Sequence, residues 1–332
     1  TAESDRIIYN SATKQLSTIG ITTIQEEGRL ILADRSFYDD PADIAVFVGN
    51  VCMSDSNQII CADSIRYNEK MKVGVALGNV VSRDTSNDVT LECERLDYND
   101  STSYVVATGR PLMTSVINSD SLFLSADTLY TYSKDTANSD SMRILIAHKN
   151  VRLFKNDFQA VCDSLVYSMT DSLFQFFIDP VLWSDTSQFT ADTIQAFLAN
   201  EKIDRIELQQ KAFLINSTDE IYFNQIKGRT ITAFFANDSI RTMRVNGNGE
   251  TVYYIQDEQK AYITANKTTC SRMLVVFDKN QVKDIHFYTQ PQGRTHPMKK
   301  IKPNTLQMEG FEWRITERPK SKDDLRQLKQ QE

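Results

Sequence analysis

Acidic residues recur at nearly regular intervals along the first two hundred residues of the chain. They are Asp34, Asp63, Glu94, Asp127, Asp163 and Asp192, and they step by 29, 31, 33, 36 and 29 residues. Paired carboxylates can carry out acid–base catalysis, and stacked carboxylates can hold Ca²⁺. An active site is unique in a chain, however, whereas this acid returns in one repeat after another. We therefore expect a structural role, in which each acid caps a corner of the chain by accepting hydrogen bonds from nearby backbone N–H groups.

Each acid lies at a slip in the apolar alternation that is typical of β-strands. In residues 57–67 the apolar positions alternate as far as Ala62, and the alternation then resumes one residue out of phase at Ile65. Such a slip turns the wrong face of a strand inward unless a corner or bulge re-aims the side chains. We expect that corner at Asp63 and at the equivalent acid of each repeat.

The slip belongs to a repeat of about 30 residues, which indicates a stacked architecture. Each repeat has a small residue before the acid and an apolar residue three positions after that small residue, with Ser36 as the exception. The second half of each repeat is another apolar stretch before a turn dipeptide, such as Gly49-Asn50 or Gly78-Asn79, and we expect these dipeptides to end their strands. Enrichment in Val, Ile, Thr, Tyr and Phe with a period of two predicts β-structure almost throughout.

The composition is that of a folded protein, with 41% hydrophobic and 24% charged residues. The net charge of −7 gives no indication of a nucleic-acid partner. The charge is uneven, because residues 291–332 carry ten Lys/Arg against six Asp/Glu. No apolar run approaches the ~18 residues of a membrane span. The chain begins at Thr1 rather than at an initiator Met, which is compatible with the removal of a targeting segment.

Five cysteines are present, so complete internal pairing is impossible. No C-x-x-C motif occurs, and we expect neither a metal site, a cofactor nor thiol catalysis. Cys93 and Cys162 occupy the small-residue position before the acid, and Cys61 lies one residue before that position. We expect all three to be small buried side chains. A disulfide between Cys61 and Cys93 is not expected, since their side chains should point to opposite faces.

Stacked repeats of this kind predict an all-β protein with two facing antiparallel sheets and an apolar trough between them. We expect repeats over residues 1–200, a degraded continuation over 201–290, and a basic, proline-containing extension over 291–332. The free edges of such a stack can template end-to-end pairing with another copy. The residues expected to line the trough are Ile60, Ile65, Tyr67, Val75, Leu77, Leu91, Leu96, Tyr98, Leu124, Leu129, Leu165, Tyr167, Phe189 and Ile194.

The repeat resembles that of a known family. Ala62-Asp63-Ser-Ile-Arg-Tyr67, followed by Val75-Ala-Leu-Gly-Asn-Val80, is similar to the repeat of OstA/LptA-like lipopolysaccharide-transport proteins. The resemblance covers residues 5–200 well and residues 200–290 loosely. The tail, with Leu306-Gln-Met-Glu-Gly-Phe-Glu-Trp313, resembles the end of a longer, Bacteroidetes-type OstA-like variety.

The resemblance implies an elongated β-jellyroll ("β-taco") in the periplasm that takes part in outer-membrane assembly. It implies a non-enzymatic role, in which the trough shields the acyl chains of lipid A. The implied partners are lipopolysaccharide, other lipopolysaccharide-transport proteins and further copies of the chain in head-to-tail assembly. Two alternatives from other classes are a β-helical carbohydrate-active or adhesive surface protein, and a scaffold whose trough is packed shut.

Overall fold

The computed structural model describes residues 1–26, 28–117, 120–134, 142–200, 202–236, 239–278, 281–302 and 304–326. The chain is all-β, with 70% of it in strands and 4% in helical turns, and the predicted fold class is confirmed. Among the described residues, no helix is both long enough and apolar enough to cross a membrane. Two compact units are present. Unit 1 comprises Thr1–Leu153 and Ser321–Glu332, and unit 2 comprises Phe154–Lys320.

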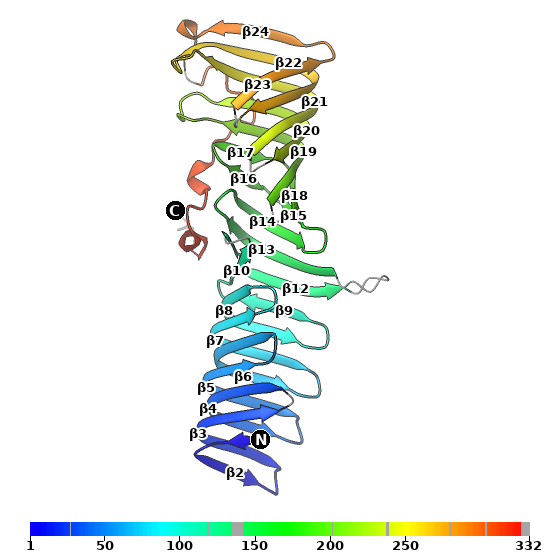
Figure 1. Cartoon of the computed structure of the whole chain (residues 1–332), viewed down its shortest axis with the longest axis vertical. Helices are drawn as coiled ribbons and strands as arrows, with labels where there is room; N and C mark the ends of the chain where they lie inside the picture. Colours follow the sequence, from blue (N-terminus) through cyan, green and yellow to red (C-terminus); the bar gives the residue numbers. More distant parts are fainter. Residues whose placement is uncertain are drawn as a thin grey trace. The chain divides into compact units, whose positions relative to one another are not determined.

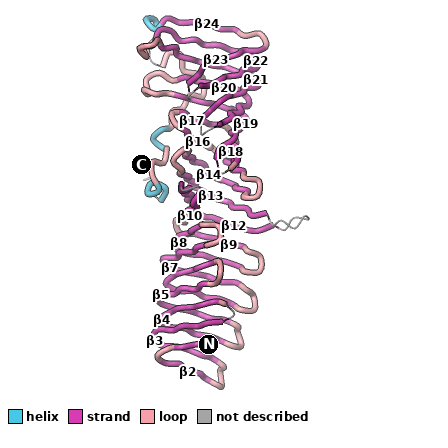
Figure 2. Tube along the Cα trace, in the orientation of Figure 1, coloured by secondary structure: helices cyan, strands magenta, loops and turns pink. Residues whose placement is uncertain are grey.

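Unit 1 is a stack of antiparallel strands (Figures 1 and 2). The strands are β1 (Ala2–Glu3), β2 (Arg6–Asn10), β3 (Gln15–Glu26), β4 (Arg29–Asp39), β5 (Ile44–Ser54), β6 (Gln58–Asn68), β7 (Val73–Asp84), β8 (Val89–Asn99), β9 (Tyr104–Thr108), β10 (Leu112–Ile117), β11 (Asp120–Ser125), β12 (Thr128–Lys134) and β13 (Met142–Phe154). The strands from β3 to β9 pair in sequence order. Farther along, β10 pairs with β8 and β12 pairs with β9. A 3₁₀ turn, η3 (Lys322–Arg326), packs against β11.

Unit 2 continues with antiparallel strands of the same kind. They are β14 (Gln159–Ser168), β15 (Leu173–Phe177), β16 (Val181–Ser184), β17 (Ser187–Thr190), β18 (Thr193–Ala199), β19 (Lys202–Asn216), β20 (Asn224–Ala236), β21 (Ser239–Gln256), β22 (Tyr262–Asp278), β23 (Gln281–Tyr288) and β24 (Gln292–Pro297). Two 3₁₀ turns follow, η1 (Met298–Lys300) and η2 (Ile315–Glu317).

The long strands of unit 1 bend near their centres, at the predicted corners. In the β5–β6 ladder Val48 faces Ser64 and Val51 faces Ala62, so that Gly49 and Asn50 together oppose Asp63. Two residues opposite one is a β-bulge, which bends the strand and re-aims the side chains beyond it. The corner predicted from the phase slip is therefore confirmed.

Two of the turn dipeptides, Gly49-Asn50 and Gly78-Asn79, lie within strands rather than at strand ends, so the expectation was wrong for these two. Gly49-Asn50 lies in the middle of β5, and Gly78-Asn79 lies in the middle of β7. Both residues of each pair have positive φ, at 81° and 45° for the first pair and 76° and 46° for the second. Gly and Asn tolerate this conformation, which serves hairpin turns and bulges alike, so the residue types alone do not distinguish the two.

The structure divides the chain at other positions than the sequence suggested. The break between units falls at residues 153–154 rather than near 200, and the continuation over 201–290 belongs to the same unit as residues 154–200. The described part of the predicted extension supplies β24 and continues along unit 2 to Lys320, and residues 321–326 belong to unit 1.

Candidate functional site: the apolar interior and its borders

Large and small side chains alternate across the inner face of unit 1. Ile65, Leu96 and Leu129 are 0%, 1% and 2% exposed. Buried alanines face them from the intervening strands, since Ala76 pairs with both Ile65 and Leu96. Ala107 in turn pairs with Leu96 and Leu129. Cross-strand partners share one face of a sheet, so this row forms a continuous apolar layer.

Most of the residues expected to line the trough lie in the interior of their unit. Leu91 is half-buried but faces inward, because it pairs with the buried Met113. Tyr167 is also half-buried, and its ring stacks on that of the buried Phe174 at 4.0 Å between centroids. The fully buried members are Ile60, Ile65, Tyr67, Leu96, Tyr98, Leu124, Leu129, Leu165, Phe189 and Ile194.

Two of the expected residues face outward instead. Leu77 is 42% exposed, and Val75 is half-buried opposite the exposed Arg66. The inward positions of β7 are the small residues Gly74 and Ala76. A Cβ on Gly74 would overlap the ring of Tyr98, so the large residues of β6 and β8 leave no room for a bulky residue between them.

The full burial of these rows shows that side chains fill the interior of each unit. In unit 2, Phe174, Phe176 and Phe189 are as deeply buried as the aliphatic residues of unit 1. We refer to the two halves of the bent strands as the two layers of a unit. A lipid chain can enter between them only if the layers move apart or side chains repack, because protein interiors are close-packed.

The first strands of unit 1 have a different interior. The hydroxyl of Thr18 lies 2.7 Å from that of Thr22 and 2.9 Å from that of Ser36. All three residues are buried. This hydroxyl cluster explains why Ser36 departs from the apolar pattern of the repeat.

The corner acids bond to side chains across the corner. Asn79 Nδ2 donates to Asp63 at 3.1 Å and Asn50 Nδ2 donates to Asp34 at 3.0 Å. The pair Asn150–Asp127 repeats the contact at 3.0 Å. These bonds support a structural role for the corner acids. In these three pairs the carboxylate accepts from the side chain of the second bulge residue, rather than from the backbone N–H groups that we expected. Arg110 lies near Glu94 and Lys211 lies near Asp192 in place of the asparagine.

A cross-rim contact closes one side of unit 1. Arg29 lies at one end of the β4–β5 ladder, since its neighbour Leu30 pairs with Ser54 at the end of β5. Tyr67 lies at the opposite end of the β5–β6 ladder, where it pairs with Ala45 near the start of β5. Despite this, the guanidinium of Arg29 lies 5.4 Å from the centre of the Tyr67 ring. The two ends of the bent strands therefore meet across the interior.

Asp100 completes this contact, which we call the rim latch (Arg29, Tyr67 and Asp100). Tyr67 donates its hydroxyl hydrogen to Asp100 at 2.8 Å, and Arg29 lies 3.6 Å from the same carboxylate. Burial, followed by the bond to Asp100, raises the pKa of Tyr67 to about 12. The neighbouring Tyr98 stacks on Tyr67, and burial raises its pKa as well.

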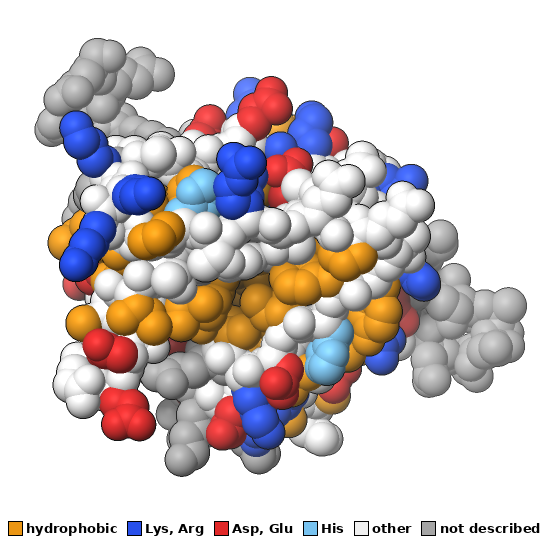
Figure 3. All heavy atoms as spheres, turned by 90° about the horizontal axis from the view of Figure 1, so that it is seen from above, with side chains coloured by type: hydrophobic (Ala, Val, Ile, Leu, Met, Phe, Trp, Pro, Cys, Tyr) orange, Lys and Arg blue, Asp and Glu red, His pale blue; other side chains and the backbone are white. Residues whose placement is uncertain are grey.

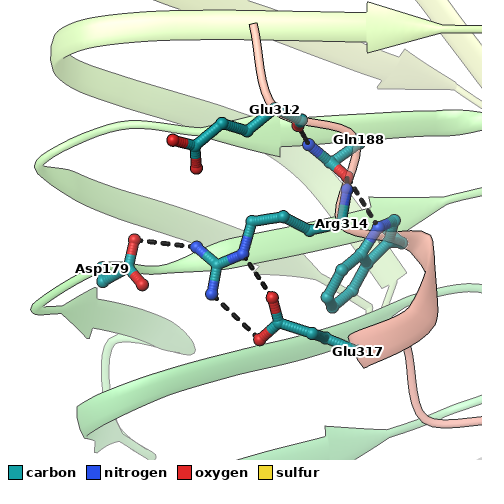
Figure 4. A network of polar contacts seen from close by, with 6 residues as sticks. Asp179, Gln188, Glu312, Arg314 and Glu317 are labelled. Carbon is teal, nitrogen blue, oxygen red and sulfur yellow. Dashed lines mark hydrogen bonds and ion pairs between the residues drawn. The ribbon is translucent and has the colours of Figure 1, made fainter. Parts of the chain in front are cut away.

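The C-terminal segment of unit 2, residues 304–320, lies along the outer face of that unit, and we call it the strap. Its main anchor is Gln188, which is 0% exposed (Figure 4). Gln188 Nε2 donates to the carbonyl of Glu312 at 2.7 Å, and the N–H of Arg314 donates to Gln188 Oε1 at 2.7 Å. Trp183 also donates its indole N–H to Gln188, at 3.3 Å.

Two more buried glutamines hold the strap in the same way. Gln225 accepts from the N–H of Met308 at 2.8 Å, and Gln159 accepts from Arg318 Nε at 2.7 Å. Arg314 pairs with Asp179 and Glu317, and these bonds raise the pKa of its guanidinium (Figure 4). Leu306 and Met308 of the strap pack into a second apolar cluster on the outer face of the sheet, together with Phe213, Ile215, Phe223, Val252, Tyr254, Ala265 and Ile301.

Cys52 and Cys61 form a disulfide between β5 and β6, which was not predicted from the sequence. The two residues face each other directly in the ladder, on opposite sides of the turn at residues 55–57. The expectation that Cys61 is a buried filler was therefore wrong, and the acidic-polar turn between the two cysteines was the available signal. Cys93 and Cys162 are buried as expected, and burial raises their thiol pKa values to about 11 and about 12.

The last strands of unit 2 leave its interior open. On β23, Phe287 faces the buried Met273 and Ile285 faces the buried Val275, so both point inward. Both are only half-buried. Figure 3 shows hydrophobic side chains in a hollow between two layers at this end.

Comparison of the sequence with protein-family models gave no match, and no curated protein is significantly similar to it.

Proposed function

We propose that this chain is a non-enzymatic lipid carrier that shields the acyl chains of lipopolysaccharide between its two layers during outer-membrane assembly. The observation that supports this most is the unbroken inner row of apolar side chains, in which Ile65, Leu96 and Leu129 follow one another from rung to rung. Each buried CH₂ group contributes about 0.8 kcal/mol, so several acyl chains would supply ample affinity.

The Cys52–Cys61 disulfide supports a location in an oxidising compartment such as the periplasm.

The terminal strands support assembly with other proteins or with further copies of the chain. On β2, Ile7 and Tyr9 face the inner residues Thr18 and Leu16, yet both are exposed. Exposed inner-face residues on a terminal strand favour pairing with another sheet edge.

A scaffold with a permanently filled interior is the second candidate, and the full burial of the inner rows favours it. The two candidates make opposite predictions for contact between lipid and the inner face. Phe47 on β5 is buried and faces inward, whereas Phe37 on β4 is exposed and faces outward. They therefore provide a matched pair of aromatic positions on neighbouring strands.

The test is to place a photoreactive benzoyl-phenylalanine at either position and irradiate the protein with purified lipopolysaccharide. We expect a lipid adduct, detected by mass, at Phe47 and none at Phe37. Adducts at neither position, with circular dichroism showing a folded protein, would support the scaffold. Equal adducts at both would indicate surface adsorption and contradict the carrier.

A further inference from the structure

The outer face of unit 1 carries bulky apolar residues that its core does not use. The strands β5 and β7 each turn two such residues outward, and Phe37 on β4 pairs with one of those on β5. Phe37, Val48 and Leu77 are 39%, 38% and 42% exposed. We define the outer patch as Phe37, Val46, Val48, Val75 and Leu77.

Two arginines lie within this patch. Arg66 stands between Val46 and Val75 in one cross-strand row, and Arg35 pairs with Val48 in the next row. Both arginines are exposed, and neither forms an ion pair with another residue of the described ranges. The outer patch therefore combines apolar surface with two unpaired positive charges, in a chain whose net charge is −7.

The corresponding row of unit 2 is polar, so the fold itself does not require apolar residues there. Gln195 lies three residues after the corner acid Asp192, as Arg66 does after Asp63. Its cross-strand row consists of Gln175, Gln195, Glu207, Thr232 and Arg244. Apolar residues that gather on one part of a protein surface mark an interaction site.

We propose that the outer patch is a docking surface for a segment of another protein that carries both apolar side chains and carboxylates. The apolar side chains of this segment cover the patch, and its carboxylates pair with Arg35 and Arg66. Arginine and aromatic residues are enriched in protein interfaces, and a guanidinium binds a carboxylate through two parallel hydrogen bonds. The inference does not depend on the lipid-carrier proposal.

The charge of the patch favours this occupant over a second copy of the chain. Two copies that met through the patch would bring Arg35 and Arg66 of one against those of the other, and like charges across an interface oppose binding. The neighbouring acid Asp97 is already paired with Arg95 at 2.6 Å. A membrane is disfavoured as well, because it needs apolar side chains that sink below its headgroups, whereas Val46 and Val75 are half-buried in the sheet face.

The first step of the test is photo-cross-linking in cells that produce the full chain. Benzoyl-phenylalanine is placed at Leu77 or, as a control, at Gln195 of the polar row. We expect an adduct with one polypeptide at Leu77 and none at Gln195. Mass spectrometry of the adduct identifies the cross-linked segment, which should contain Asp or Glu beside apolar residues.

The second step measures binding of that segment, as a synthetic peptide, to the purified full chain. Arg35→Glu/Arg66→Glu should weaken binding about tenfold or more, and a peptide with lysines in place of its carboxylates should bind this variant again. The control variant Arg241→Glu/Arg272→Glu makes the same change of net charge at exposed positions of unit 2 and should bind like the wild type.

Several results would overturn the inference. Absence of a polypeptide adduct at Leu77, or the same adduct at Gln195, would contradict a docking site on the patch. An adduct with a second copy would make the patch a self-association surface, and an adduct of lipid mass would make it a membrane contact. Equal affinity of the wild type and Arg35→Glu/Arg66→Glu for the peptide would contradict the pairing of charges.

Discussion

On the inner face of β7, two small residues stand opposite large residues of the neighbouring strands. Gly74 faces Tyr67 and Tyr98, and Ala76 faces Ile65 and Leu96. Leu77 was expected to face inward because bulky apolar residues are the usual core residues of strands. Layers that interdigitate need small residues opposite large ones, so side-chain bulk alone gave the wrong face for β7.

The packing of Gly74 against Tyr98 gives a direct test at this scale. Gly74→Ala introduces a Cβ into the space of the Tyr98 ring. We expect a loss of about 1–3 kcal/mol in the free energy of unfolding, which is the usual cost of overpacking a core. Urea unfolding monitored by circular dichroism measures it.

Two further variants decide whether overpacking is the cause. Leu77→Ala on the exposed face of β7 should change the free energy of unfolding by less than about 1 kcal/mol. In the double variant Gly74→Ala/Tyr98→Leu, the cost of the Gly74 change should shrink, because the ring that it displaces is gone. An unchanged cost in the double variant would contradict the explanation.

At the scale of the elements, local sequence pattern predicted the bends but not their partners. The phase slip around Asp63 located the corner correctly, since alternation is a property of one strand. Gly49-Asn50 was assigned to a turn because positive φ suits both a hairpin and a bulge. Only the ladder, in which the dipeptide stands opposite Asp63, distinguishes them.

The strap was not predictable from local pattern, because its anchors are distant in the sequence. Gln188 and Arg314 are separated by 126 residues. The polar Gln188 lies in a strand that is buried on both faces, a position where a glutamine requires hydrogen-bond partners. A buried glutamine in a strand therefore marks a covered outer face only once the covering segment is known.

Removing the Gln188 anchor should loosen the strap. Gln188→Ala leaves the carbonyl of Glu312, the N–H of Arg314 and the indole of Trp183 without this partner. We expect a loss of about 1–3 kcal/mol in the free energy of unfolding, and faster hydrogen exchange over residues 306–318. Mass-spectrometric hydrogen exchange measures the second effect.

The control for this variant is Gln209→Ala. This change removes an exposed side-chain amide whose hydrogen bond is to Gln195 and not to the strap. It should leave exchange in the strap unchanged. If Gln188→Ala speeds exchange throughout unit 2 but not preferentially in residues 306–318, Gln188 supports the sheet rather than the strap.

At the scale of the molecule, each unit is a stack in which a rung covers the inner face of the one before it. Stability in such a stack is a sum of contacts between neighbouring rungs, and residues such as Leu96 and Ile194 are predictable because they repeat at each rung. The division at residues 153–154 was not predictable, since the repeat runs through it. The filled interior was not predictable either, because the pattern specifies which residues face inward and not how far apart the layers lie.

A filled interior makes uptake of lipid depend on separation of the rims, and the rim latch opposes that separation in unit 1. Arg29→Gln removes the ion pair with Asp100 and the cation over Tyr67. A partly exposed ion pair contributes ~0.5–1 kcal/mol, so the open population should rise about two- to fivefold. The apparent affinity for a fluorescent acyl probe should rise by the same factor, measured by titration at low probe concentration.

Arg95→Gln is the control, because Arg95 pairs with Asp97 of its own strand at 2.6 Å rather than with a residue across the interior. An identical affinity in all three proteins would mean that lipid reaches the interior without opening this side, and would leave the open end as the route.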